Sequence, residues 1–193
     1  MNLLVLGPQG SGKGTQAKRI AEDRGIPHVS TGDMFRAAID AHTDLGREVA
    51  PILASGELVP DELTIALIRE RLSEPDALRG FVLDGFPRNL AQAAALDTML
   101  AEIGRSLDGV LFFDLSDEIA LDRLLGRAQD EGRHDDTPEV IARRLEIYHD
   151  QTEPVVEFYR ATGKLVPLHA ERSIDEVAAE IGDALDLVEG AAA

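Results

Sequence analysis

The sequence of 193 residues contains no cysteine and no tryptophan, and aromatic residues make up only 4% of it. Without cysteine the chain can form neither a disulfide nor a thiolate metal site, and a cysteine nucleophile is excluded. This favours a reducing compartment. The scarcity of aromatics predicts a core built from leucine, isoleucine, valine and alanine. The hydrophobic content of 44% is that of a globular protein and not of a disordered acidic tail.

Basic residues are also scarce. Lysine and arginine number 19 against 36 aspartates and glutamates, which gives a formal net charge of −17 at pH 7. A general nucleic-acid binder needs a broad basic surface. An anionic membrane repels a protein whose surface is acidic. We therefore expect neither a nucleic acid nor a membrane among the partners of this protein.

Long apolar runs are missing as well. No stretch approaches the roughly 20 apolar residues that cross a bilayer. The first apolar run, residues 3–6, lacks a basic leader and is too short for a signal peptide. We therefore expect a cytoplasmic protein, and the length together with the absence of repeats and linkers predicts a single domain over residues 1–193.

Short apolar runs alternate with longer helical patterns along the whole chain. The runs are continuous more than alternating, as in strands that are covered on both faces. This order predicts an α/β fold in which helices cover both faces of a parallel sheet. The expected strands are residues 3–6, 27–29, 81–83, 110–113 and 165–167.

Helix starts are marked by capping sequences. Residues 30–33 (STGD) and 173–176 (SIDE) have the pattern of a capping box. Residues 136–138 (DTP) place a capping residue before a proline at the first helical position. Two segments interrupt the simple alternation: residues 31–60 hold two helical patterns with no strand between them, and residues 129–136 are polar. We expect both to lie outside the core and to be mobile.

The strongest motif is the glycine-rich sequence GPQGSGKGT at residues 7–15, between the first strand and a helix. Its glycines let backbone N–H groups point at an anion, the helix N-terminus adds a positive dipole, and Lys13 supplies a charge for phosphates. The usual serine or threonine after the lysine is replaced by Gly14, with Thr15 next. The magnesium arrangement of regulatory GTPases therefore does not carry over, and their guanine-reading sequence is also missing.

A carboxylate, Asp84, ends the third apolar run. The carboxyl ends of parallel strands line the ligand crevice. We therefore expect Asp84 to reach the magnesium of a bound nucleotide, through water.

Together with the glycine-rich loop, three stretches resemble the adenylate kinase family over essentially the whole chain. They are residues 30–36, residues 84–88 and an arginine series, Arg123, Arg127, Arg133 and Arg144. The resemblance implies a P-loop three-layer sandwich with a five-stranded parallel sheet and helices on both faces. It also implies a mobile AMP-binding segment at residues 30–59, a short lid at residues 127–137, and a monomer.

By this resemblance the chain transfers the terminal phosphoryl group of Mg-ATP to AMP and forms two ADP. The catalytic residues implied are Lys13, Arg88, Arg123, Arg133 and Arg144. The ATP-binding residues implied are Gly10, Ser11, Gly12, Lys13, Gly14, Thr15, Arg123, Arg127 and Arg172. The AMP-binding residues implied are Thr31, Arg36, Glu57, Leu58, Val59, Gly85, Phe86, Pro87, Arg88, Gln92, Arg133 and Arg144.

The implied cofactor is Mg²⁺, held at Asp84, and zinc is not expected because the short lid has no cysteine. Phosphoryl transfer needs positioning and charge neutralisation, and the accepting phosphate is already ionised, so no general base is required. Arginines supply the forked donors that match phosphate oxygens. Apart from Arg172, seven of the 19 cations are thereby assigned to the phosphates of one site, and Arg143 is left as a surface residue.

Two alternatives remain. Related pyrimidine monophosphate kinases tend to have alanine in place of Thr31 and asparagine near Gln92, so a UMP/CMP-type kinase is the nearer alternative and AMP is favoured. A nucleotide-binding switch is the other alternative. A switch has no need of the second phosphate clamp that Arg36 and Arg88 are expected to form.

Overall fold

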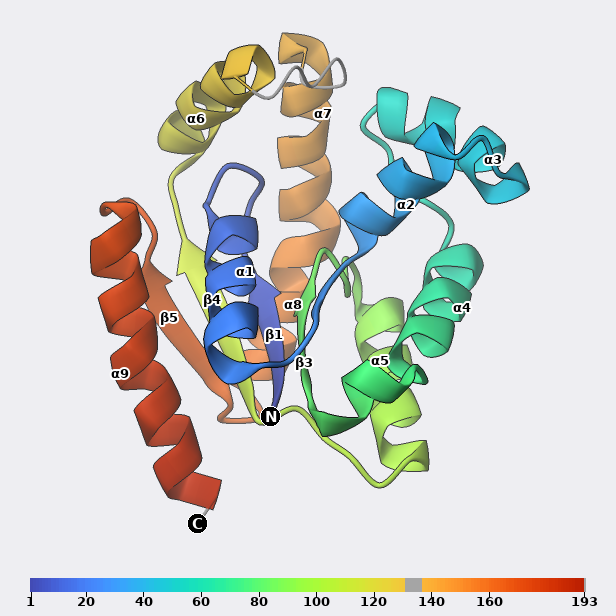
Figure 1. Ribbon diagram of the computed structural model, residues 1–193. Coiled ribbons are helices and arrows are strands. Elements are labelled where there is room, and N and C mark those ends of the chain that lie inside the picture. The colour runs from blue at the N-terminus through green and yellow to red at the C-terminus, as the bar shows by residue number, and fades with distance from the viewer. Residues whose placement is uncertain (131–136, 193) are drawn as a thin grey trace.

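The computed structural model describes residues 1–130 and 137–192, and its centre is a parallel sheet (Figure 1). In the described part of the chain the sheet has five strands in the order β2-β3-β1-β4-β5. They are β1 (Asn2–Leu6), β2 (His28–Ser30), β3 (Phe81–Asp84), β4 (Gly109–Asp114) and β5 (Leu165–His169). Every strand expected from an apolar run is confirmed, with ends within two residues of those expected.

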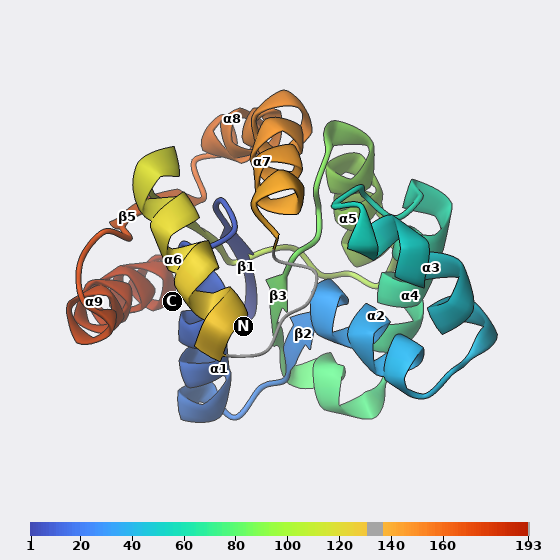
Figure 2. The same ribbon diagram turned by 90° about the horizontal axis from the view of Figure 1, so that it is seen from above.

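Helices connect the strands and lie on both faces of the sheet (Figures 1 and 2). They are α1 (Lys13–Arg24), α2 (Thr31–Asp40), α3 (Asp44–Ala54), α4 (Asp61–Leu72), η1 (Pro75–Arg79), α5 (Leu90–Glu102), α6 (Asp117–Asp130), α7 (Pro138–Ile147), η2 (Tyr148–Thr152), α8 (Glu153–Arg160) and α9 (Ile174–Ala192). Among the described residues, no helix has the length and apolar character to cross a membrane.

The side chains of β1 show how the two layers are filled. Leu3 and Val5 pack with α1, α6 and α9 on one face, whereas Leu4 and Leu6 pack with α4, α5 and α8 on the other. Both sets are buried, which explains why the strand is apolar from Leu3 to Leu6. The core is mainly aliphatic, as expected, but the few aromatics are concentrated in it: Phe81, Phe86, Phe113 and Tyr159 are each under 2% exposed.

Residues 31–60 form the first departure from the layered pattern, and they contain two helices with no strand, as expected. Helices α2 and α3 enclose a small apolar cluster of their own, made by Phe35, Val49 and Val59. They stand beside the end of the sheet at which the strands finish (Figure 1). The second expected departure, residues 129–136, falls largely outside the described residues.

The three helix starts indicated by the sequence are confirmed. Ser30 Oγ accepts the Asp33 N–H at 3.3 Å and begins α2. Ser173 and Glu176 cap each other at the start of α9: each backbone N–H donates to the side chain of the other residue. Thr137 is the N-cap of α7, directly before the proline at its first position.

One histidine links three helical elements on the surface. His149 in η2 lies 2.9 Å from Glu153, the first residue of α8, and 2.9 Å from Asp117, the first residue of α6. The hydrogen bonds to Glu153 and Asp117 raise the pKa of His149. The protonated imidazole therefore holds the start of α6 against α8.

We expect His149→Ala to lower thermal stability in a pH-dependent way. The folded pKa lies above the unfolded value, so the stabilisation is complete below about pH 6.5 and is lost as the pH rises through the folded pKa. Two half-exposed ion pairs correspond to a fall in Tm of about 2 °C at about pH 5.5, shrinking towards zero at about pH 9. Thermal melts of both proteins across this range measure it. High salt should reduce the difference at low pH, and an equal deficit at both ends of the range would contradict the assignment.

Candidate active site

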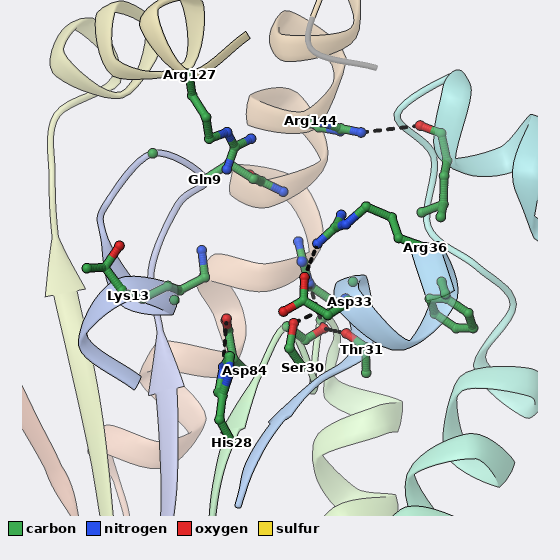
Figure 3. Close-up of a pocket in the computed structure, with 18 of the residues that line it drawn as sticks. Gln9, Lys13, His28, Ser30, Thr31, Asp33, Arg36, Asp84, Arg127 and Arg144 are labelled. Atoms are coloured by element: carbon green, nitrogen blue, oxygen red, sulfur yellow. Dashed lines mark hydrogen bonds and ion pairs between the residues drawn. The ribbon is translucent and has the colours of Figure 1, made fainter. Parts of the chain in front are cut away.

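The carboxyl ends of β1, β2 and β3 open into a cavity of about 850 Å³. Helices α6 and α7 stand over this edge of the sheet, and α2 closes one side (Figures 1 and 2). This is the edge at which doubly wound sheets bind ligands, and the volume suits a ligand larger than one small anion. Lys13, Asp84, Arg36, Arg127 and Arg144 all extend toward its interior (Figure 3).

The loop of residues 7–12 forms the floor beside α1. Gly12 adopts φ 80° as the N-cap of α1 and offers no side chain to that helix end. A Cβ on Gly10 would lie 2.8 Å from the carbonyl oxygen of Ala120, so the close approach of this loop to α6 requires glycine. The first turn of α1 carries no acidic residue, which leaves the positive end of its dipole available to an anion.

Lys13 is the cation of this loop. Its Nζ donates a 3.0 Å hydrogen bond to the carbonyl of Pro8. Burial lowers the pKa of Lys13 to about 8; the nearby Asp84 acts in the opposite direction, and Arg88 and Arg127 add to the lowering. The ammonium group is therefore held in a place where an additional negative charge stabilises it.

Asp84 ends β3 next to this lysine (Figure 3). Its Oδ2 lies 3.5 Å from His28 Nε2, and a Cβ on Gly14 would lie 3.2 Å from the same oxygen. Burial acts to raise the pKa of Asp84, but His28, Lys13 and Arg88 outweigh it, and the pKa stays below the usual range. The carboxylate is thus ionised at neutral pH, and glycine at position 14 leaves it close to the phosphate-binding loop.

On the far side of the cavity, hydrogen bonds converge on the carbonyl of Gly85. It accepts from Thr31 Oγ1 at 2.9 Å and from Arg88 Nε at 2.8 Å. A Cβ on Gly85 would lie 2.6 Å from Thr31 Oγ1, so the contact depends on glycine. The carbonyl of Arg88 in turn accepts from Thr152 Oγ1 at 2.8 Å. These bonds fix the Arg88 guanidinium in place.

Arg36 reaches into the same side from α2. It donates a 2.6 Å hydrogen bond to Asp33, one turn earlier. Burial opposes the effect, yet the bond to Arg36 keeps the pKa of Asp33 below its ordinary value. Asp33 therefore holds the Arg36 guanidinium beside the cavity as a charged pair.

Three arginines approach from the helices above. Arg123 of α6 donates to the carbonyls of Ala170 and Glu171, at 2.8 and 3.2 Å. Arg127 extends from the same helix into the cavity, and Arg144 of α7 donates to the carbonyl of Leu53 at 3.2 Å (Figure 3). Arg123 and Arg127, four residues apart, thus both line the cavity from one helix.

The net charge of the residues that line the cavity is opposite in sign to the net charge of the whole chain. Among the described residues that line it there are eight lysines and arginines and four aspartates and glutamates. The whole sequence has the reverse balance, 19 against 36. A cavity with excess positive charge inside an acidic protein selects a ligand with several negative charges.

The structure brings most of the expected site residues together. Those lining the cavity are Gly10, Gly12, Lys13, Gly14, Thr15, Thr31, Arg36, Glu57, Leu58, Val59, Asp84, Gly85, Arg88, Gln92, Arg123, Arg127 and Arg144. Four expected residues do not line it: Ser11 and Phe86 are buried, Pro87 follows Phe86 in a cis peptide, and Arg172 lies on the surface 3.9 Å from Glu180. Arg133 and most of the expected lid lie outside the described residues.

Sequence reasoning missed one contact at the rim. Arg143 was expected to be an ordinary surface arginine, and it is partly exposed, but its Nε donates to Glu57 at 2.7 Å. A second bond runs from Arg143 to Glu57 at 3.2 Å. This pair joins α7 to the segment at residues 30–59 across 86 positions, so only the fold reveals it.

A phosphate-binding loop at the start of α1, with a second group of arginines facing it across one cavity, defines a P-loop phosphotransferase. The sequence model of the adenylate kinase family matches residues 5–164. The chain is 48% identical to the adenylate kinase of Stenotrophomonas maltophilia over 94% of this chain and 97% of the relative. It is 48% identical to that of Xanthomonas campestris and 46% identical to that of Xylella fastidiosa, each over 96% of this chain and 99% of the relative. The chain belongs to the adenylate kinase family.

The lowered pKa of Lys13 predicts proton uptake when a nucleotide binds. Above about pH 8 much of Lys13 is neutral in the free protein, and phosphate groups beside it favour the charged form and raise its pKa. We expect up to one proton to be taken up per ATP bound at about pH 9, and affinity for ATP to fall as the pH rises past 8. Calorimetry in buffers of different ionisation enthalpy measures the uptake. Lys13→Gln should abolish it, and uptake that persists in this variant would assign the proton to another group.

Proposed function

We propose that the chain catalyses the reversible transfer of the terminal phosphoryl group from Mg-ATP to AMP, which gives two ADP. One observation carries this proposal: a single cavity holds two separate groups of cations. Lys13, Arg123 and Arg127 surround the phosphate loop, where a nucleoside triphosphate binds. Arg36, Arg88 and Arg144 lie on the other side, where a nucleotide with one phosphate binds.

The chemistry requires little of the protein beyond position and charge. The phosphate oxygen of the acceptor is already ionised near neutral pH, so no base has to remove a proton from it. Charge spreads over the oxygens of the transferring group in the transition state, and fixed guanidinium groups stabilise that charge. Because Arg88 is held by Gly85 and by the contact of its backbone with Thr152, it meets the acceptor phosphate already oriented.

The residues beside Lys13 suit a magnesium ion. Oxygen donors are the ligands that Mg²⁺ prefers, and Asp84 is a buried, ionised carboxylate at the edge of the phosphate loop. We assign Asp84 to hold the ion, through water. When bound, the metal would neutralise part of the charge on the ATP phosphates.

The acceptor base lies, in this proposal, between Thr31, Gln92 and the backbone of residues 57–59. All of these line the cavity on the side of Arg88 and Arg36. Thr31 and Gln92 each present a polar side chain, as an adenine edge requires. Since relatives 46–48% identical to this chain are adenylate kinases, AMP is the acceptor that we propose.

Two segments move in this proposal. Residues 30–59 carry Arg36 and close over AMP, and the short lid at residues 127–137 carries Arg127 and Arg133 and closes over the reacting phosphates. Closure excludes water, which would otherwise accept the phosphoryl group in place of AMP. We further propose that the protein acts as a cytoplasmic monomer.

Initial rates with Mg-ATP and a panel of acceptors test the proposal directly. We expect AMP to be used at least about tenfold more efficiently than UMP, CMP or GMP. ATP alone should be hydrolysed only slowly, because water is a poor competitor in the closed site. Equal turnover of UMP would replace the acceptor assigned here, and hydrolysis without any transfer to a nucleotide would reject the kinase assignment.

Arg88→Ala tests the second phosphate clamp. Burial together with Arg144 and Arg36 lowers the pKa of Arg88 against the charge of Asp84, so the fold does not rely on this guanidinium. We expect kcat/KM for AMP to fall about 10²- to 10³-fold, with KM for ATP and the melting temperature nearly unchanged. Arg160→Ala removes an exposed arginine that is paired with Glu157, and it should behave as the unsubstituted protein. An unchanged rate in Arg88→Ala would show that Arg88 does not clamp the acceptor phosphate.

A further inference from the structure

A small polar cluster joins the start of α4 to the start of α5 beside the acceptor side of the cavity. Asp61, the first residue of α4, accepts two hydrogen bonds at the same oxygen: from Gln92 Nε2 at 2.7 Å and from Asn89 Nδ2 at 2.9 Å. The other end of the Gln92 amide, Oε1, accepts the backbone N–H of Arg88 at 2.7 Å. Gln92 is 1% exposed and lines the cavity.

These partners determine which way round the Gln92 amide lies. The two ends of an amide are nearly equal in shape, so its orientation is set by the groups that it meets. The Arg88 N–H can only donate, and the carboxylate of Asp61 accepts both of its bonds. The reverse orientation would place two donors together at Arg88 and two acceptors together at Asp61, inside a buried site.

The donor and the acceptor of Gln92 that remain free therefore lie in a fixed arrangement. One Nε2 hydrogen and one Oε1 lone pair are left after the bonds to Asp61 and Arg88. Purine bases differ in which of their two positions, 6 or N1, donates a hydrogen bond and which accepts one. AMP has a donor at position 6 and an acceptor at N1, whereas IMP and GMP have an acceptor at position 6 and a donor at N1.

We propose that Asp61 is a positioning residue that sets the purine specificity of the acceptor site by fixing the orientation of the Gln92 amide. This inference rests on the proposed function, in which Gln92 faces the acceptor base. An amide held in one orientation can match the order of AMP or that of a 6-oxopurine nucleotide, but not both. With AMP as the proposed acceptor, the orientation held by Asp61 is the one that selects a 6-aminopurine, although the arrangement does not require Asp61 itself to touch the nucleotide.

Asp61→Ala removes one of the two partners that orient the amide and leaves only the Arg88 N–H, so the amide is held less firmly. IMP is the sharpest probe because it differs from AMP only at position 6 and N1. We expect the ratio of kcat/KM for AMP to that for IMP to fall about tenfold. IMP should be used better than by the unsubstituted protein, and KM for ATP should stay the same. A gain on IMP separates positioning from mere loss of structure, which would weaken both acceptors together.

Glu62→Ala is the matched control, because Glu62 is an exposed acid in the same turn of α4. It should keep the ratio of the unsubstituted protein. Asp61→Asn keeps the shape of the side chain but can donate as well as accept a hydrogen bond. It should therefore shift the ratio in the same direction by a smaller factor. If Asp61→Ala does not fold, Asp61→Asn takes its place in the test. An unchanged ratio in the folded Asp61 variant, or an equal loss on AMP and IMP, overturns the proposal. Absence of transfer to AMP in the unsubstituted protein would instead reject the proposed function.

Discussion

The structure depends on keeping several cations close together within an acidic chain. Lys13 and Arg88 show the electrostatic strain of this arrangement, because burial and neighbouring arginines lower the pKa of each. Strands β1 and β3 are buried at the centre of the sheet, and Lys13 and Arg88 follow them closely along the chain, so these two cations stay near each other. The phosphates of a nucleotide supply the negative charge that this part of the molecule lacks, and binding and electrostatic relief are therefore the same event.

Features that depend on neighbouring residues could be predicted from the sequence. The five strands follow from continuous apolar runs, and the phosphate loop follows from glycines between a strand and a helix. The helix caps are equally local, since Ser30, Thr137 and Ser173 each bond within three residues. The acceptor side was expected from its resemblance to a family, because nothing in the spacing of Arg36 and Arg88 alone shows that they meet.

Features that depend on distant contacts could not be predicted. Asp61 bonds to residues 28 and 31 positions away, and Glu57 pairs with an arginine 86 positions away. Neighbouring arginines on α7 also diverge: Arg144 reaches Leu53, while Arg143 turns to Glu57. Ser11, Phe86 and Pro87 adjoin residues that line the cavity, yet side chains next to each other in sequence point in different directions. Arg172 lies on the surface near Glu180. Their exclusion became visible only in three dimensions.

The strand register around Asp84 has a consequence for how such a chain can vary. Asp84 is paired with Val5 of β1 on one side and with Ser30 of β2 on the other, so hydrogen bonds between three strands set its distance from the phosphate loop and from α2. Removing or adding one residue within β3 would turn its carboxylate to the opposite face of the sheet. Changes of length that preserve the chemistry are therefore confined to segments outside the sheet. The pairing of β1, β2 and β3 therefore fixes the position of Asp84, while the helices and loops outside the sheet can change in length without moving it.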